Sequence, residues 1–476
     1  MSVYGYHRLT TPPVDPFATE GVPFERHLNP SVLTTAAYAS LFTGMDCFGT
    51  DVVGLRHKVG LGPHVTTLAE ILAEQGYNTT CVSVTGNPAA RGFQPYLDYG
   101  GWGIDASGRS PKAENRNGAA IPELDRFSRE EALFLLFLRH MDPHAPYLLP
   151  GPFERVFYGG DGRDPDKQST ERVFAFKPFV DNFRTWIPEA CTDSEYVAPQ
   201  YDGAVASMDA CMQNILARVQ ALGSDEATLI VFTADHGESL DEHECYFDHP
   251  GMYDCTLVVP CILRFPLRVP RGLRIGDVTL ISDVLPKILD LLAVRSEIPL
   301  PGWSLAPLLH GRLLPRVSES YITETTWMRK HGWRMQEWKH RTSTSSPRPN
   351  CTTSCLIPLN CTTSQTRDPR SWPCSRRECR IGLRSGSGRR AVPIPCSPIL
   401  TGIAPTAACV RDAPHRLSEG SPSVARSVQG TKGRRPADGR HLRAGALGTG
   451  GLLTCMSSKG GMCHGFSAQS AHHHDR

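Results

Sequence analysis

The sequence predicts an α/β fold, with a mostly parallel sheet that carries helices on both of its faces. Continuous apolar runs at 132–138 ("ALFLLFL") and 227–234 ("ATLIVFTA") are typical of strands that are covered on both faces. Between them, the segment 201–223 places its apolar residues at helical spacing. Strand, helix and strand in this order favour parallel pairing, and ligands bind such sheets at the carboxyl ends of the strands.

The remaining elements are predicted from the same patterns. Residues 67–76 have helical spacing, an N-terminal threonine and a closing glycine, so they predict a capped helix. Residues 256–265 ("TLVVPCILRF") predict a third buried strand, and 282–294 predict a further helix. The apolar residues of the 201–223 helix form one stripe, which favours a face buried in the core over a cofactor site. The stripe consists of Val205, Met208, Met212, Ile215, Val219 and Leu222.

Composition divides the chain near residue 340. The 476 residues are long enough for two or three domains, and their net charge is +2. Residues 1–340 contain 30 basic and 42 acidic side chains, whereas 341–476 contain 20 basic and 6 acidic ones. No apolar run has membrane-spanning length and no secretory signal opens the chain, so we expect no membrane partner and a cytoplasmic location.

The segment 341–476 lacks hydrophobic periodicity. A basic nucleic-acid-binding tail is one interpretation, because it has 18 Arg and 2 Lys, and a cysteine-based zinc module is another, although no paired C-x₂-C motif is present. A third, translation out of frame, fits better. Shifting the frame of 350–373 by one base, with permitted codons, turns the two copies of "NCTTS" into "ELYDL" and "ELHNL". We therefore predict a disordered, out-of-frame tail with no nucleic-acid partner.

Two ionisable side chains end the second apolar strand. Asp235 and His236 follow Ala234 directly, and a carboxylate beside an imidazole suits a divalent cation. Gly237 allows the chain to turn tightly beside them. The alternative is an Asp-His pair that caps the next helix. His144, in "MDPHAPY" after the first apolar strand, and His249, in "YFDHPGMYD", add imidazoles from two more loops.

With these residues, the chain resembles the sulfatase family of the alkaline-phosphatase superfamily. Residues 232–266 resemble the late metal-binding segment of that family, and "LFLRHMDPHAPY" resembles its substrate-histidine segment. Residues 4–44 are similar to the stretch that leads into the nucleophile, and 302–311 and 322–339 to the start of the smaller C-terminal subdomain. The resemblance covers roughly residues 3–339 and implies an alkaline-phosphatase-like sheet.

The resemblance also implies a nucleophile. Sulfatases carry C-x-P-S-R a fixed distance before an "LLTG"-like turn, and counting back from "LFTG" (41–44) places Thr34 at the Cys, with Tyr38 at the Arg. Formylglycine cannot form from Thr34, so the chain looks more like the phosphodiesterase-like relatives that attack with threonine. The neighbouring Thr35 is the main rival for this role.

The other site residues follow from matching positions. The resemblance implies that Asp235 and His236 bind a divalent cation (Ca²⁺, Mn²⁺ or Zn²⁺) and that His144 and His249 contact the substrate and assist catalysis. Asn87, in "VTGNP", is a weaker candidate for substrate binding. The expected substrate is a small sulfate or phosphate ester. A threonine nucleophile favours the phosphoester somewhat, because water must cleave the covalent ester at the same centre. The sequence carries no signal for an oligomeric state.

One departure from the family affects activity. Its members begin with a buried strand that ends in metal-binding carboxylates, whereas residues 1–6 already resemble the segment after that strand. We therefore expect an incomplete catalytic domain at 1–300, the start of the C-terminal subdomain at 301–340, and little hydrolase activity. The alternatives are a catalytically inactive remnant and, from another class, a nucleic-acid-binding protein that uses the basic tail.

Overall fold

The computed structural model describes residues 1–311, except 55–59, 85–88, 176–186, 188–190, 250 and 299. Beyond residue 311 it describes the backbone of seven strands, β9 to β15. Among the described residues, none of the helices is both long enough and apolar enough to cross a membrane.

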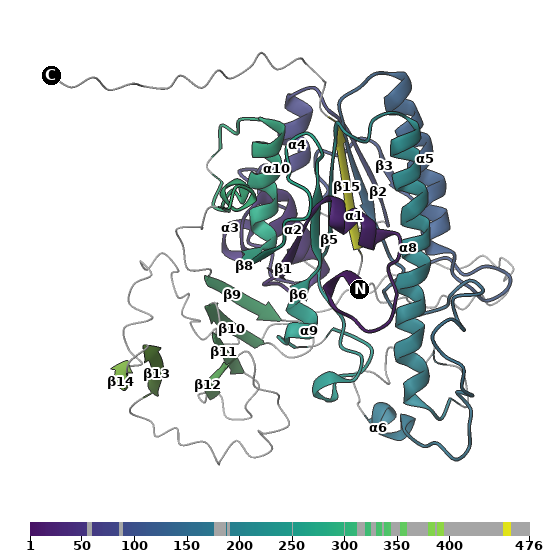
Figure 1. Cartoon of the computed structure of the whole chain (residues 1–476), viewed down its shortest axis with the longest axis vertical. Coiled ribbons are helices and arrows are strands. Elements are labelled where there is room, and N and C mark those ends of the chain that lie inside the picture. Colours follow the sequence, from purple (N-terminus) through teal and green to yellow (C-terminus); the bar gives the residue numbers. More distant parts are fainter. Residues whose placement is uncertain are drawn as a thin grey trace, which may run out of the picture. The chain divides into compact units, whose positions relative to one another are not determined.

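A nine-stranded sheet forms the centre of the first part of the chain (Figure 1). Its strand order is β3-β2-β4-β15-β5-β7-β1-β6, and β8 pairs with β1. The strands are β1 (Val22–Leu28), β2 (Asn78–Ser83), β3 (Tyr96–Asp98), β4 (Phe134–Arg139), β5 (Thr228–Ala234), β6 (Val258–Val259), β7 (Cys261–Arg264), β8 (Ile275–Leu280) and β15 (Gly451–Ser457).

The predicted α/β fold is confirmed, and most strands of the central sheet run in one direction although several neighbours pair antiparallel. Strands β1, β2, β3, β4, β5 and β8 run in one direction, whereas β6, β7 and β15 run in the other. The third predicted strand differs in its details. It divides into β6 and β7, and β7 lies antiparallel to β5 because the connection between them contains no long crossover helix.

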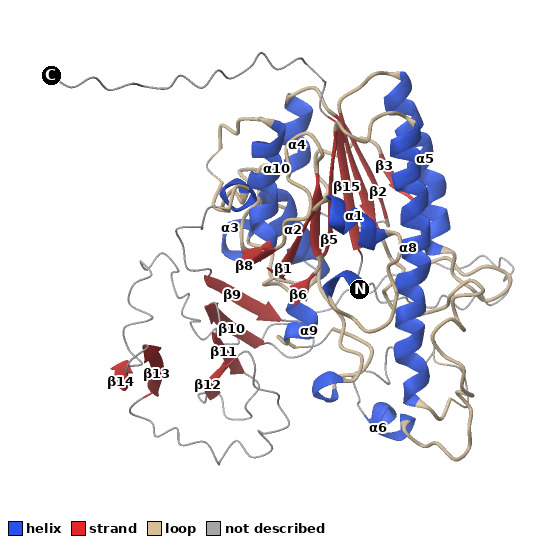
Figure 2. Ribbon diagram, viewed as in Figure 1, coloured by secondary structure: helices blue, strands red, loops and turns tan. Residues whose placement is uncertain are grey.

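Helices cover both faces of this sheet (Figure 2). Alternate residues of β4 point to opposite faces, so Leu135 and Phe137 join one core while Leu136 and Leu138 join the other. The first core includes residues of α2 (Thr34–Thr43), α4 (Leu68–Glu74) and α10 (Val284–Leu292). The second includes residues of α1 (Val14–Glu20), α5 (Lys112–Arg129) and α8 (Val197–Ala221).

The predicted helices form for the expected local reasons. In α4, Thr67 accepts a bond from the Glu70 backbone while Glu70 accepts from the Thr67 backbone, a reciprocal cap. The apolar stripe of α8 is core, as predicted, since Val205, Met208 and Ile215 are buried against the sheet. The shorter elements are η1 (Ser2–Tyr4), α3 (Cys47–Thr50), α6 (Thr170–Ala175), η2 (Ser194–Tyr196), η3 (Glu242–Glu244), α9 (Asp254–Leu257), η4 (Ile281–Asp283) and α11 (Ala306–Leu309).

One strand of the central sheet comes from the far end of the chain. β15 lies between β4 and β5 and runs antiparallel to both, and it is the yellow strand of Figure 1. Its first residue, Gly451, pairs with Ala234, and Leu452 pairs with Arg139. Residues 341–476 were predicted to be a disordered tail, and β15 lies within that segment. Most of the segment lies outside the described residues, and for it disorder stays a prediction.

The chain divides into two compact units. One contains Met1–Asn360 and Gly445–Arg476, and the other contains Cys361–Ala444. The first unit includes a second sheet of β9 (Glu319–Glu324), β10 (Lys330–Met335), β11 (Trp338–Ser343) and β12 (Thr353–Pro358). This sheet runs across the predicted boundary at residue 340. The second unit includes the pair β13 (Cys379–Ser385) and β14 (Gly388–Ile394).

Candidate active site

The predicted site residues follow strands that run in the same direction. Asp235 and His236 come directly after β5, His144 comes five residues after β4, and Thr34 begins α2 in the connection that leaves β1. Carboxyl ends of parallel strands meet at one edge of a sheet, so these residues are brought to the same edge. Asn87 lies outside the described residues, and its role stays a prediction.

Thr34 contacts the imidazole of His236. The Thr34 Oγ1 atom lies 3.3 Å from His236 Nε2, and both side chains are buried. Thr34 is the first residue of α2, whose first-turn N–H groups favour nearby negative charge. Thr35 is buried to a similar degree, but the contact with His236 Nε2 is made by Thr34.

The tautomer of His236 follows from its second ring nitrogen. His236 Nδ1 lies 3.0 Å from the Gly237 carbonyl oxygen, which can only accept, so Nδ1 carries the proton. Nε2 then presents a lone pair toward Thr34 and toward Asp235 Oδ2, which lies 3.6 Å away. Burial lowers the pKa of His236 to about 4, which keeps the ring neutral at neutral pH.

Gly237 is required by a close approach of two backbones. A Cβ atom at this position would lie 2.0 Å from the Cys255 carbonyl oxygen, and the Gly237 N–H donates to the Thr256 carbonyl at 2.9 Å. The sequence predicted a tight turn here. In the structure, a glycine is needed at residue 237 because the loop that carries Asp235 and His236 packs closely against α9.

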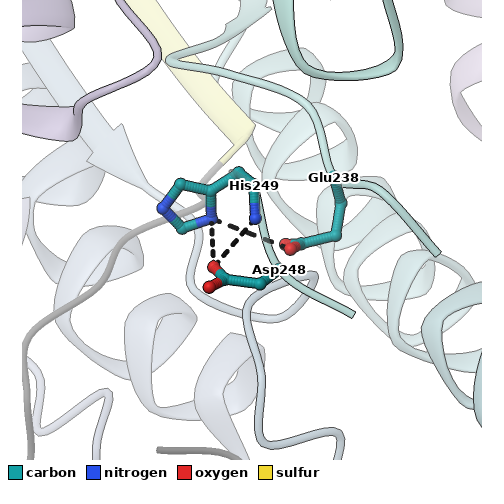
Figure 3. Close-up of side chains that lie close together, drawn as sticks. All are labelled: Glu238, Asp248 and His249. Atoms are coloured by element: carbon teal, nitrogen blue, oxygen red, sulfur yellow. Dashed lines mark hydrogen bonds and ion pairs between the residues drawn. The ribbon is translucent and has the colours of Figure 1, made fainter. Parts of the chain in front are cut away.

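His249 lies close to His236 and to two carboxylates, and Figure 3 shows His249 with the carboxylates Glu238 and Asp248. Its ring centroid is 4.0 Å from that of His236. Asp248 Oδ1 lies 3.0 Å from His249 Nδ1 and accepts the His249 backbone N–H at 2.8 Å, and Glu238 Oε1 lies 3.7 Å from the same nitrogen. Sequence reasoning missed Glu238 and Asp248, because acidic residues in a loop carry no signal of burial.

His144 completes the group of imidazoles. Its ring centroid lies 6.4 Å from that of His249, and its Nδ1 contacts the Ala145 carbonyl. His144 Nε2 is buried and has no hydrogen-bond partner among the described residues. Burial, together with the nearby Lys112 cation, lowers the pKa of His144 well below its usual value. An anion placed against Nε2 would oppose this effect and favour the protonated ring.

Lys112 holds the loop that carries His144. Its Nζ donates to three carbonyl oxygens, those of Met141 at 3.1 Å, His144 at 2.7 Å and Pro146 at 3.3 Å. Lys112 is buried, and desolvation lowers the pKa of its ammonium group to about 8. Three convergent acceptors use all three of its N–H groups. The loop geometry therefore depends on a lysine in α5 that the sequence did not single out.

Two arrangements of side chains could hold a cation. Donor atoms bound to one small cation at 2.0–2.3 Å lie about 3 to 3.5 Å apart. The Thr34–His236 separation of 3.3 Å lies within that range, and the His236–Asp235 separation of 3.6 Å lies just above it. A second group consists of Glu238, Asp248 and His249, whose ligand atoms lie within 4.8 Å of one another. The donor chemistry of both groups fits a divalent cation.

Asp235 is also tied to the neighbouring strand connection. The Asn29 side-chain amide donates to the Asp235 carbonyl oxygen, and Asn29 Oδ1 accepts from the Ser31 N–H at 3.0 Å. The Asp235 side chain accepts the His236 N–H at 3.1 Å. These bonds fix the ends of β1 and β5 relative to each other, and they hold the Asp235 carboxylate at the buried edge of the sheet.

Comparison with known proteins agrees with this architecture. The Sulfatase family model matches residues 1–294. A multifunctional alkaline phosphatase superfamily protein, PehA, from Trinickia caryophylli is 24% identical over 373 residues, which cover 63% of this chain and 71% of that protein. The crystal structure of a phosphonate monoester hydrolase of Agrobacterium radiobacter has a TM-score of 0.58 at 19% identity and covers 77% of this chain and 89% of that one.

A further solved structure has a bound ligand. It is a complex with the substrate D-glucosamine-2-N,6-O-disulfate, and it has a TM-score of 0.54 at 16% identity. The match covers 75% of this chain and 88% of that chain. At this level of identity the likeness concerns the fold.

Proposed function

Because the chain belongs to the sulfatase family, we propose that it hydrolyses sulfuric or phosphoric esters with Thr34 as the nucleophile. The observation that carries this proposal is the 3.3 Å separation of Thr34 Oγ1 from His236 Nε2, beside the buried Asp235 carboxylate. PehA is named as an alkaline phosphatase superfamily protein and the solved structure as a phosphonate monoester hydrolase, which supports including phosphorus esters among the proposed substrates.

The proposed metal site consists of Asp235, His236 and Thr34. A divalent cation bound there would lower the pKa of the Thr34 hydroxyl and withdraw charge from the ester. The Asp235 carboxylate supplies the negative charge, and the neutral His236 ring, oriented by the Gly237 carbonyl, supplies a nitrogen ligand.

The proposed reaction has two displacements at phosphorus or sulfur. Thr34 Oγ1 forms a bond to that atom, and the bond to the leaving alcohol breaks with a proton transferred to its oxygen. Water then cleaves the threonine ester and restores the hydroxyl. We assign His144 and His249 to contact the charged oxygens of the ester and to supply the proton, and the 6.4 Å separation of their ring centroids supports a shared role for the two rings.

A catalytically inactive remnant is the second candidate. The site end of β15 is Gly451, paired with Ala234, and a glycine offers no carboxylate to a cation beside Asp235. A weakly held cation would activate Thr34 poorly. This observation favours slow turnover or none.

The test is hydrolysis of an aryl phosphodiester and an aryl sulfate by the full chain with Mn²⁺. We expect slow hydrolysis that Thr34→Ala abolishes and that Thr35→Ala retains within about threefold, because Thr34 makes the contact with His236. If the Thr35 variant loses activity and the Thr34 variant keeps it, the nucleophile is misassigned. If the parent protein binds Mn²⁺ but is no more active than Thr34→Ala, the inactive remnant is correct.

A further inference from the structure

A row of aromatic rings leads from the buried catalytic group to an exposed tryptophan. His236 contacts His249 at a centroid separation of 4.0 Å, His249 contacts His144 at 6.4 Å, and His144 contacts Trp102 at 5.1 Å with the rings perpendicular. The exposed fraction is 3% for His144 and 36% for Trp102. Trp102 is therefore the exposed end of this row.

The turn that carries Trp102 has a defined shape. Gly100 has a φ of +67°, a left-handed conformation that favours glycine, and its carbonyl accepts the Gly103 N–H at 2.8 Å. At Gly101, a Cβ atom would lie 2.8 Å from both the Tyr99 ring and Val84 Cγ1. The two glycines thus let the chain turn tightly against Tyr99 and set the position of the next residue, Trp102.

The same turn is tied to the segment that carries His144. The Tyr99 hydroxyl donates to the Arg139 carbonyl at 2.9 Å, where β4 ends. Ser110 Oγ donates to the Gly103 carbonyl at 2.7 Å, and the Ser110 N–H donates to the Leu148 carbonyl at 2.8 Å. Bonds on both sides of His144 therefore hold Trp102 against its ring.

We propose that Trp102 binds the ring of an aryl leaving group and makes the site selective for aryl esters over small alkyl esters. This inference rests on the proposed function, which places an ester oxygen against His144. A group bonded to that oxygen lies next to Trp102, because the two rings are already in contact. The half-exposed indole offers an aromatic surface to a second ring, and such pairs prefer stacked or perpendicular contact.

The experiment measures binding of phenylphosphonate and methylphosphonate to the full chain by calorimetry in the presence of Mn²⁺. Neither compound has an ester bond to cleave, so binding is measured without turnover. We expect the parent protein to bind phenylphosphonate more tightly. Trp102→Ala should weaken phenylphosphonate binding by about three- to tenfold and leave methylphosphonate binding unchanged within about twofold.

Three variants serve as controls. Trp102→Phe keeps an aromatic ring and should retain most of the preference for phenylphosphonate. Gly101→Ala keeps the indole but displaces it, because the new Cβ meets Tyr99 and Val84, and it should reduce the preference. Trp303→Ala removes a tryptophan that is 43% exposed, outside this turn, and should change neither affinity.

The outcomes separate the two proposals. If Trp102→Ala lowers both affinities equally or neither, while the parent protein binds phosphonates, the role of Trp102 is wrong and the proposed function stands. If the parent protein binds neither phosphonate with Mn²⁺ present, the proposed function fails and this inference with it. Equal thermal unfolding midpoints for Trp102→Ala and the parent protein would exclude misfolding as the cause of a lost affinity.

Discussion

Thr34 Oγ1 lies 3.3 Å from His236 Nε2, although 202 residues separate the two in the chain. Thr34 follows β1 and His236 follows β5, and these strands run in the same direction within one sheet. The sheet topology therefore brings a hydroxyl and an imidazole lone pair together at its carboxyl edge. The following predictions test what this edge does and what stabilises it.

The location of the cation can be decided by paired amide variants. Asp235→Asn should weaken Mn²⁺ binding at least about tenfold, because it removes the carboxylate ligand beside His236 and Thr34. Glu238→Gln should leave binding within about threefold, because we assign Glu238 to the surroundings of His249. Calorimetric titration with Mn²⁺ measures both. The reverse result would place the cation at Glu238, Asp248 and His249.

Gly237→Ala should destabilise the protein by about 2 to 4 kcal/mol, because the added Cβ would lie 2.0 Å from the Cys255 carbonyl and one backbone must move. The matched control is Gly118→Ala in α5, where an added Cβ meets nothing within 4 Å. In a helix this change should be neutral or stabilise by up to about 1 kcal/mol. Urea unfolding measures both, and equal midpoints for the two variants would contradict the packing argument.

Thr454→Pro tests the place of β15 in the sheet. Thr454 pairs with Phe137 on one side and with Val231 on the other, so β15 is a central strand. Proline removes an N–H and fits poorly in a central strand, and we expect a loss of about 3 kcal/mol or more in unfolding free energy. Thr454→Val keeps the N–H and should unfold like the parent protein. Unfolding curves that coincide for all three would show that β15 contributes nothing.

Lys287→Met should stabilise the protein near neutral pH. Lys287 is 1% exposed, its Nζ has no hydrogen-bond partner among the described residues, and it lies 3.6 Å from the centroid of the Phe24 ring. Desolvation lowers the pKa of Lys287 to about 7. At pH 7 the unfolded chain holds this proton more firmly than the folded chain, so burial costs on the order of 2 to 4 kcal/mol.

The sign of the pH dependence gives a second check on Lys287. As the pH rises from 7 toward 10.5, the unfolded lysine also loses its proton, so the advantage of the Met variant should shrink. Lys167→Met is the control, because Lys167 is paired with Asp193 and its side chain is 41% exposed. Thermal unfolding between pH 7 and 10 measures both variants. A stabilisation by Lys287→Met that grows with pH would contradict the argument.

The sequence by itself determined the main helices and strands and the kinds of ionisable side chain that follow the strands. In β4, β5 and α8, the spacing of the apolar residues predicts which side chains are buried, because each element buries a regular face. Asp235, His236, His144 and His249 were recognisable because they directly follow such runs or lie in matching motifs. These features are local, so a linear reading finds them.

Only the tertiary structure decided which of these groups meet. The contact of Thr34 with His236, the carboxylates beside His249 and the three carbonyls around Lys112 join segments far apart in the chain. The tertiary structure also decided the position of β15, because its sequence has no strand signal strong enough to predict a central position. It likewise decided the antiparallel direction of β7. The backbone N–H and C=O groups of a strand can form hydrogen bonds with any neighbouring strand. The pairing partners are therefore set by the arrangement of the whole sheet and not by the local sequence.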